Sequence, residues 1–242
     1  MRKTSKIYVA GHRGLVGSAI VNSLKKKGFS KIILRTKSQL DLTKQIKVKN
    51  FFKKHKPEIV IIAAAKVGGI YANNKYQANF IYENLMIQNN LINSSFENKV
   101  KKVIFLGSSC IYPKYSKQPI KEDYLLSGEL EKTNISYAVA KISGLVMCNS
   151  YNMQYNYRTD FRCLMPTNLY GPGDNYHGLN SHVIPALIKR FHNAKIKKKK
   201  SIKVWGNGLA KREFLFSEDL AEAVILILKL SRQRYKKFLS NN

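Results

Sequence analysis

The chain has 242 residues, a length that suits one large α/β domain or two modest ones. Its hydrophobic residues make up 44% and its charged residues 24%, which is typical of a globular protein and excludes a disordered or fibrous one. The three cysteines, Cys110, Cys148 and Cys163, form neither a disulfide framework nor a metal-binding pair, so we expect a reducing, cytoplasmic setting. No apolar run approaches the ~20 residues that span a bilayer, and no signal peptide is recognisable. We therefore expect no membrane partner.

The charge is strongly unbalanced, because 43 Lys and Arg residues against 14 Asp and Glu residues give a formal net charge of +29. Clustered cations bind nucleic-acid phosphates, so a nucleic-acid-binding protein is one alternative. The cations are spread along the whole chain, however, and aromatic residues interleaved with arginines are missing. We interpret the dense run 197–200 as a solvated loop. We expect no specific nucleic-acid partner, and instead an attraction for a negatively charged substrate.

Short apolar runs alternate with longer amphipathic stretches along the first two thirds of the chain. The pattern predicts strands at Lys6–Ala10, Lys31–Arg35, Glu58–Ala65, Lys102–Leu106 and near Asp160–Met165, and helices at Val16–Lys27, Lys44–His55, Phe80–Glu97 and Tyr137–Tyr155. Strands rich in Val and Ile that are separated by helices indicate βαβ units. The expected fold class is therefore α/β, a doubly wound parallel sheet of the Rossmann type with a smaller C-terminal lobe.

A glycine-rich turn lies between the first predicted strand and the first predicted helix. Gly11, Gly14 and Gly17 have the spacing GxxGxxG, which allows a tight turn, a close approach of backbone to a pyrophosphate and close helix–strand packing. The helix N-terminus then offers free N–H groups and a partial positive charge to the anion. This arrangement predicts a dinucleotide-binding site.

The end of the second predicted strand favours NADP over NAD. An NAD site needs Asp or Glu there to accept a hydrogen bond from the ribose 2′-OH, and the chain has no carboxylate until Asp41. Arg13, Arg35 and Lys37 would instead attract a 2′-phosphate. The alternative that Arg35 and Lys37 only belong to the lysine-rich background stays open for either residue taken alone.

Three residues form a candidate reductase site. Tyr137 and Lys141 form a Tyr-x-x-x-Lys pattern, and the i, i+4 spacing places them on one helix face. An ammonium group near a phenol favours the phenolate, so we expect Lys141 to lower the pKa of Tyr137, which would donate a proton to a carbonyl. Ser108 follows a buried strand at the carboxyl edge where open α/β sheets bind ligands, and it could hydrogen-bond the same oxygen.

The glycine turn, the serine and the Tyr-x-x-x-Lys pattern, in this order, resemble the extended short-chain dehydrogenases/reductases. Longer strings resemble the GDP-L-fucose synthases within that family, from residue 6 to about residue 228. They are AAAKVGGI at 63–70, LGSSCIYP at 106–113, MPTNLYGP at 165–172, NSHVIPA at 180–186, and the shorter matches at 205–206 and 212–215.

The resemblance implies a two-stage conversion of GDP-4-keto-6-deoxy-D-mannose to GDP-L-fucose. The first stage epimerises C3 and C5, and the second reduces the C4 ketone with NADPH. Cys110 and His182 match the family's acid and base for the epimerisation, beside Ser108, Tyr137 and Lys141. Their chemistry suits the task, because imidazole titrates near neutrality and a thiol beside a cation becomes a usable base.

The resemblance also assigns the binding residues and a partner. For the cofactor they are Gly11, His12, Arg13, Gly14, Leu15, Val16, Gly17, Lys37, Ser38, Gln39, Leu40, Asp41, Leu42, Leu106, Gly107, Ser108, Ser109, Lys141, Pro166, Thr167, Asn168, Leu169 and His182. For the nucleotide sugar they are Arg190, Trp205 and Arg212, because arginine can clamp a diphosphate and an indole ring can stack on the sugar nucleotide. A homodimer through the helices 80–97 and 137–155 is the implied assembly.

The chain departs from the family pattern in two places. The sequence from Ser231 onward does not resemble the family, whose members continue further, so the resemblance implies a C-terminally truncated member. We expect an NADP-binding Rossmann domain at 1–165 and a partial substrate lobe at 166–242, interleaved with the last Rossmann elements and with an atypical tail after about residue 229. About two extra residues at Asn156–Thr159 predict a turn there.

Two alternatives remain open at this point. The first is an inactive or cofactor-binding-only truncated relative. The second is another nucleotide-sugar reductase, 4-epimerase or dehydratase of the same fold. Those relatives usually carry a threonine where this chain has Cys110, which argues against the second alternative.

Overall fold

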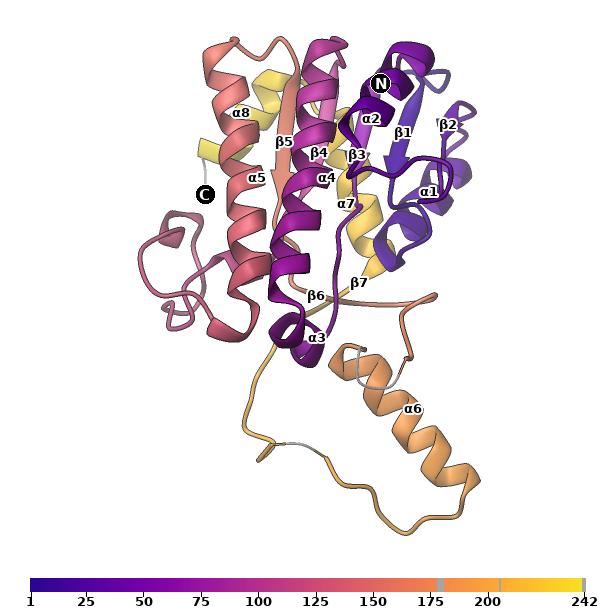
Figure 1. The fold of residues 1–242 in the computed structure, drawn as a ribbon, viewed down its shortest axis with the longest axis vertical. Helices are drawn as coiled ribbons and strands as arrows, with labels where there is room; N and C mark the ends of the chain where they lie inside the picture. The colour runs from indigo at the N-terminus through magenta and orange to yellow at the C-terminus, as the bar shows by residue number, and fades with distance from the viewer. Residues whose placement is uncertain (178–180, 205, 241–242) are drawn as a thin grey trace.

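The computed structural model describes residues 1–177, 181–204 and 206–240. At its centre is a five-stranded parallel sheet with the strand order β2-β1-β3-β4-β5 (Figure 1). The strands are β1 (Ile7–Ala10), β2 (Ile32–Ile33), β3 (Ile59–Ile62), β4 (Lys102–Leu106) and β5 (Asp160–Leu164). The predicted α/β fold class with a doubly wound parallel sheet is confirmed.

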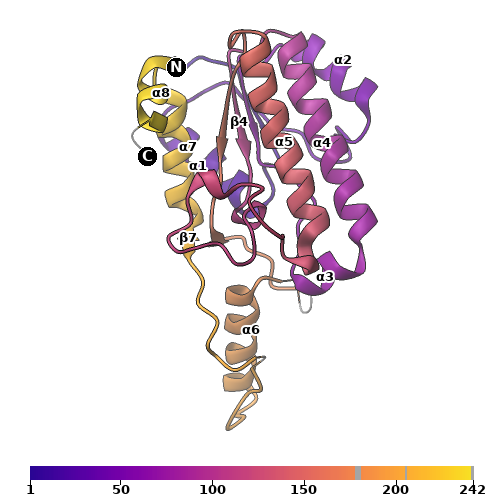
Figure 2. The ribbon, with the colours of Figure 1, turned by 90° about the vertical axis from the view of Figure 1, so that its left-hand side faces the viewer.

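Helices cover both faces of the sheet (Figure 2). One face carries α1 (Leu15–Lys26) and α7 (Ser217–Lys229), and the other carries α2 (Gln45–His55), α4 (Gln77–Glu97) and α5 (Ile135–Gln154). Successive side chains along a strand point to opposite faces of the sheet. Ile59 and Ile61 of β3 pack with α1 and α7, whereas Val60 and Ile62 pack with α2, α4 and α5. Burial on both sides explains why the strands are continuous apolar runs.

The segment after β5 leaves the sheet and returns to it. A second, two-stranded parallel sheet joins β6 (Asn168–Tyr170) to β7 (Phe214–Phe216), and α6 (Val183–Ile196) lies between them in the sequence. Figures 1 and 2 show α6 extending away from the central sheet. The basic run 197–200 follows α6 and is exposed outside regular structure, as expected of a solvated loop.

Several predicted bounds are wrong. The second strand contains only two residues instead of Lys31–Arg35, and the third ends at Ile62 instead of Ala65. Ala63 N still donates to Ala10 O at the end of β1, but further along the backbone leaves the sheet, where the buried Asn84 side chain bonds both Lys66 N and Lys66 O. Short helices were also missed, namely α3 (Ile70–Lys75) and the 3-10 turns Ser109–Ile111, Glu122–Tyr124 and Lys132–Asn134.

The tail after residue 229 forms the helix α8 (Arg232–Ser240). Tyr235 of α8 packs against the core, and the guanidinium of Arg162 lies 4.5 Å from the centre of its ring. Arg232 likewise stacks over Tyr157 at 3.8 Å, in the turn that precedes β5. Asn156 and Tyr157 have φ of 46° and 58°, so the predicted turn is present.

A buried and a half-buried cation fasten α7 to the sheet. Arg162, 1% exposed on β5, pairs with the Asp160 carboxylate at 2.6 Å and donates to the carbonyl of Ile227. Lys102 Nζ donates to the carbonyls of Leu228 at 2.9 Å and Leu230 at 2.7 Å. These bonds satisfy carbonyl groups that the C-terminal end of α7 leaves without intrahelical partners. No helix in the described ranges is long and apolar enough to cross a membrane.

Candidate active site

The glycine turn after β1 has the geometry that a diphosphate requires. Gly11 has φ of +85°, and a Cβ there would lie 2.6 Å from Ala64 N, so only glycine fits against the end of β3. A Cβ at Gly17 would collide with the carbonyl of Gly11. Gly14 is exposed, with only Gly11 O near its Cβ position, at 3.5 Å. The backbone is therefore tightly packed at Gly11 and Gly17 and stays accessible at Gly14.

The N-terminus of α1 suits an anion. Gly14 caps the helix without a side-chain hydrogen bond, and the first turn contains no acidic residue. The first N–H groups therefore point outward with the positive end of the helix dipole, and no carboxylate repels a phosphate. His12 and Arg13 lie in the turn, and Arg13 is exposed. These residues fit the pyrophosphate of a dinucleotide.

The segment after β2 is rich in cations. Arg35 donates to the carbonyl of Leu34 at 2.7 Å, shares a 3.3 Å hydrogen bond with His55 Nε2 and lies 5.8 Å from the ring centre of Phe51. The first carboxylate, Asp41, accepts hydrogen bonds from the backbone and side chain of Thr43, which lower the pKa of Asp41. Asp41 therefore shapes the loop, and the residues present fit a 2′-phosphate better than a free ribose 2′-OH.

Three predicted catalytic side chains converge after β4. Ser108 Oγ accepts a hydrogen bond from Cys110 N at 3.3 Å, which caps the 3-10 turn. The hydroxyl of Tyr137, from the first turn of α5, is hydrogen-bonded to the Ser108 side chain and close enough to Cys110 to feel its charge. The structure therefore brings an alcohol, a thiol and a phenol together at the carboxyl edge of the sheet.

Lys141 lies beside this group and is almost completely buried, with 4% of its surface exposed. Its Nζ donates to the carbonyl of Leu106 at 2.7 Å and lies 4.9 Å from the ring centre of Phe105 and 5.7 Å from that of Tyr137. Burial disfavours the charged form and lowers the pKa of Lys141 to about 8. The lysine can therefore gain or lose a proton near neutral pH.

The expectation that Lys141 lowers the pKa of Tyr137 is wrong. Desolvation of the phenol, followed by repulsion from Cys110, raises the pKa of Tyr137 above its ordinary value, and the hydrogen bond from Ser108 only partly opposes this rise. The Lys141 ammonium is bonded to the Leu106 carbonyl and faces the tyrosine ring, so its charge does not counter the desolvation. Tyr137 accordingly stays protonated at neutral pH, which is the form that could donate a proton.

The segment 164–169, which contains the cofactor residues predicted after β5, lies alongside the Ser108 turn. Gly107 N donates to Leu164 O at 2.8 Å, and Ser109 N donates to Pro166 O at 3.1 Å. Asn168 Nδ2 donates to Glu213 O at 3.0 Å and ties the segment to β7. The predicted binding residues 106–109 and 166–169 thus share one edge of the sheet.

Three predicted residues have no hydrogen bond or ion pair to this group within the described ranges, and a fourth lies outside those ranges. His182 is exposed at the start of α6, and within the described ranges no hydrogen bond or ion pair joins its imidazole to Cys110 or Tyr137. Arg190 is on α6, and Arg212 is exposed, with a 2.7 Å bond to the carbonyl of Lys211. Trp205 lies outside the described residues. The roles of all four stay predictions.

The residues that hold α5 in place are not among the predicted ones. Gln88 of α4, 2% exposed, donates to Ala140 O at 2.6 Å, immediately before Lys141. A Cβ at Gly144 would collide with the ring of Phe105, so this glycine lets α5 approach β4 closely. The sequence does carry a signal for them. Asn84 and Gln88 are four residues apart on the buried stripe of α4, and buried amides need hydrogen-bond partners in neighbouring segments.

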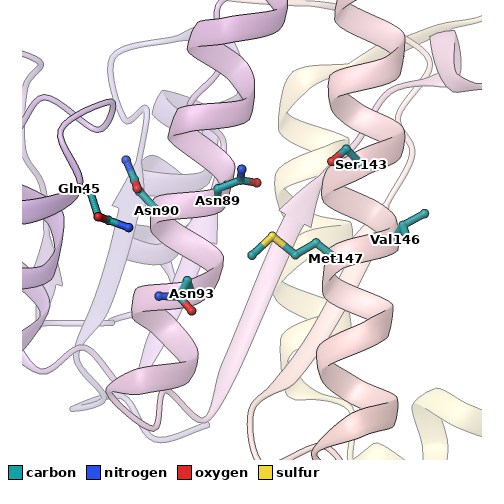
Figure 3. Close-up of a pocket in the computed structure, with 7 residues that line it drawn as sticks. All are labelled: Gln45, Asn89, Asn90, Asn93, Ser143, Val146 and Met147. Atoms are coloured by element: carbon teal, nitrogen blue, oxygen red, sulfur yellow. The ribbon is translucent and has the colours of Figure 1, made fainter.

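Two cavities lie outside the Ser108–Tyr137 group. A cavity of about 460 Å³ lies between α2, α4 and α5 (Figure 3) and is lined by Gln45, Asn89, Asn90, Asn93, Ser143, Val146 and Met147. A second, of about 300 Å³, is lined by Tyr170, Gly171, Pro172, Asp174, Tyr176, Ile184, Pro185 and Ile188. The second lies between the loop after β6 and α6, the helix that also carries the predicted substrate residue Arg190.

We expect Lys141 to contribute stability that rises between about pH 8 and pH 10, and Lys141→Met to lack this contribution. The pKa of Lys141 is lower in the folded state than in the unfolded chain, so the unfolded state binds more protons in this window. Across the whole difference between the folded and unfolded pKa values of Lys141, this contribution to the free energy of unfolding amounts to about 3 kcal/mol. Urea denaturation of both proteins at several pH values measures it. Equal pH profiles for the two proteins would contradict the lowered pKa.

Comparison with known proteins agrees with this geometry. The model of the NAD dependent epimerase/dehydratase family matches residues 7–238. GDP-L-fucose synthase 1 of Arabidopsis thaliana is 55% identical over 226 residues, which are 93% of this chain and 69% of that protein. GDP-L-fucose synthase of Escherichia coli K12 is 51% identical over 94% of this chain and 70% of its own length.

A solved structure is similar over the same part of the chain. The GDP-mannoheptose C4 reductase MlghC from Campylobacter jejuni, with NADP bound, has a TM-score of 0.88 and 45% identity, and the match covers 95% of this chain and 74% of that one. The chain thus spans about 70% of the length of these relatives. It belongs to the NAD dependent epimerase/dehydratase family and, within that family, groups with the GDP-L-fucose synthases.

Proposed function

We propose that the protein is an NADP-dependent epimerase/reductase that converts GDP-4-keto-6-deoxy-D-mannose to GDP-L-fucose. The observation that carries this proposal is the convergence of Ser108, Cys110 and Tyr137 beside the buried Lys141, in a chain 55% identical to a GDP-L-fucose synthase. The cofactor is NADP(H), and it supplies the hydride that reduces the C4 ketone. The glycine turn would hold its diphosphate, and the cations after β2 would bind its 2′-phosphate.

In the reduction, Tyr137 donates its proton to the C4 oxygen while Ser108 positions that oxygen with a hydrogen bond. The raised pKa of Tyr137 keeps the proton available at neutral pH. Lys141, with a pKa of about 8, lies against the tyrosine ring and helps the phenol to recover a proton. The lysine also binds the cofactor ribose.

In the epimerisation, Cys110 and His182 remove and return protons at C3 and C5. Both carbons are adjacent to the C4 ketone, so each proton removal produces an enolate. Tyr137 and Ser108 hold its oxygen, so one pair of hydroxyl groups serves both stages. Cys110 already lies beside Tyr137 in this structure. His182 completes the site from the N-terminal end of α6.

The remaining predicted residues contact the nucleotide sugar. Arg190 and Arg212 bind the diphosphate, and Trp205 packs against the sugar nucleotide. Arg190 is on α6, and other residues of that helix line the cavity of about 300 Å³. We assign residues 1–165 to the cofactor-binding domain and 166–242 to a substrate lobe, interleaved with it through α7, which packs on α1.

The assembly we propose is a homodimer through the outer faces of α4 and α5, in a cytoplasmic protein with free thiols. These faces leave large apolar side chains exposed, among them Tyr82, Val146 and Met153. The thiols of Cys110, Cys148 and Cys163 are unpaired, which suits a reducing compartment.

Tyr137→Phe should lower the rate of NADPH oxidation with the 4-keto sugar by at least about 100-fold, because the proton donor is lost. NADPH affinity should stay within about twofold of that of the unmodified protein, since the ring and Lys141 remain. Stopped-flow absorbance and a fluorescence titration measure the two quantities. Tyr151 is on α5, like Tyr137, and its hydroxyl donates to Asn93 of α4, so Tyr151→Phe is the matched control with normal turnover. Normal turnover in Tyr137→Phe would remove this residue from the acid role.

Cys110→Ser should slow solvent-deuterium exchange at C3 and C5 of the substrate by about 100-fold or more, because a serine hydroxyl is a far weaker acid than a thiol and supplies almost no anionic base near neutral pH. Mass spectrometry of the substrate in D₂O, without NADPH, measures the exchange. Reduction at C4 by the same variant is the internal control and should fall less. Unaltered exchange would exclude Cys110 from the epimerisation.

Sedimentation velocity should give twice the mass of the chain. Val146→Lys, at an exposed position of α5, should shift the protein to the monomer, because a lysine charge would be buried in the interface. Leu226→Lys, at an exposed position of α7 on the other side of the sheet, is the control and should leave the dimer intact. A Val146→Lys dimer as tight as the original would place the interface elsewhere.

A further inference from the structure

A carboxylate bridges two lysines at the edge of the predicted cofactor site. Glu83 of α4 forms an ion pair with Lys66 Nζ, and its other oxygen lies 3.6 Å from Lys37 Nζ. We call these three residues the lysine–glutamate bridge. The side chains of Glu83 and Lys66 are 21% and 32% exposed, whereas that of Lys37 is 78% exposed. The bridge is thus partly shielded from solvent on one side and open on the other.

The backbone of Lys66 is held more firmly than that of an ordinary loop residue. Asn84, next to Glu83 and 2% exposed, accepts from Lys66 N at 2.8 Å and donates to Lys66 O at 3.0 Å. It also donates to Phe80 O within α4 at 2.8 Å. These bonds fix the loop after β3 to α4. The backbone that carries the Lys66 side chain is therefore held in one position.

The bridge joins the loops that follow β2 and β3, the two strands on either side of β1. The glycine turn follows β1 between them, and Gly11 touches Ala64, two residues before Lys66. Ligands of open α/β sheets bind at the carboxyl ends of these strands, and the residues after the second strand face the adenosine ribose. Lys37 and Lys66 therefore approach the ribose end of the dinucleotide from two loops.

We propose that Lys66 and Glu83 determine the selectivity for the 2′-phosphate of the cofactor, an inference that rests on the proposed use of NADP(H). A 2′-phosphate carries nearly two negative charges at neutral pH, whereas the bridge carries one net positive charge. The ammonium groups attract that phosphate, and the Glu83 carboxylate repels it and competes for the same N–H donors. Glu83 thus limits an affinity that Lys66 and Lys37 create.

A purely structural ion pair makes a different prediction. If the bridge only braced the two loops, removing either partner would loosen the same contact, and binding would change in the same direction in both variants. If the bridge acts on the phosphate by its charge, removing the anion strengthens binding and removing a cation weakens it. The signs of the two effects therefore separate the two roles.

The experiment is a calorimetric titration of the full chain with 2′,5′-ADP and with 5′-AMP, which differ only in the 2′-phosphate. Glu83→Gln should bind 2′,5′-ADP about threefold more tightly or better, and Lys66→Met about fivefold more weakly. Affinity for 5′-AMP should stay within about twofold in both variants, and added salt should shrink both effects. Glu97→Gln, which breaks the ion pair with Lys49 at the other end of α4, is the matched control and should change neither affinity.

The outcomes are distinguishable. If the unmodified protein prefers 2′,5′-ADP but Glu83→Gln and Lys66→Met both weaken its binding or both leave it unchanged, the bridge is a brace and the inference is wrong. If the unmodified protein binds the two nucleotides equally, the preference for NADP itself fails, and this inference fails with it. Circular dichroism melting of each variant confirms that any loss of binding occurs in folded protein.

Discussion

The burial of one ammonium group organises the catalytic edge of this protein. Placing the Lys141 charge in the interior is costly, and the cost is offset by the Leu106 carbonyl and by the rings of Phe105 and Tyr137. These partners are available because Gly144 lets α5 approach β4. The same approach carries the first turn of α5 to the end of β4, where Tyr137 meets the Ser108 turn. The position of the phenol thus follows from the way the lysine is buried.

Buried amides on α4 extend this control to the rest of the carboxyl edge. Asn84 bonds the backbone of Lys66, Gln88 bonds Ala140, and Asn90 donates to Leu42 O at 2.8 Å. An amide left unpaired in the interior would cost about 1–3 kcal/mol, so each bond specifies one position of the loop or helix it reaches. A single helix therefore positions the loops after β2 and β3 and the start of the catalytic helix.

The sequence predicts the parts of this architecture that depend on local spacing. Apolar alternation identifies the strands of the central sheet, the glycine spacing locates the phosphate turn, and the i, i+4 pair places Tyr137 and Lys141 together. Prediction from the sequence fails where contacts between residues far apart in the chain determine the structure or the pKa. The pKa of Tyr137 depends on desolvation and on Cys110, neither of which follows from spacing, and α8 is stabilised by a contact between Tyr235 and Arg162 of β5. The short β2 and β3 likewise reflect loops whose backbone bonds α4 and the neighbouring loops.

The closeness of Cys110 and Tyr137 also limits which of the two can be ionised at each stage of the proposed reaction. Repulsion from Cys110 raises the pKa of Tyr137, so a thiolate and a phenolate are disfavoured at the same time. When Cys110 is the base, Tyr137 must keep its proton, and a protonated phenol is what the enolate oxygen needs as a hydrogen-bond donor. When Tyr137 gives up its proton in the reduction, Lys141, with a pKa of about 8, lies against its ring and helps the phenol to recover a proton. Burial thus raises the pKa of Tyr137 and lowers the pKa of Lys141. One group of side chains can therefore serve as donor in both stages.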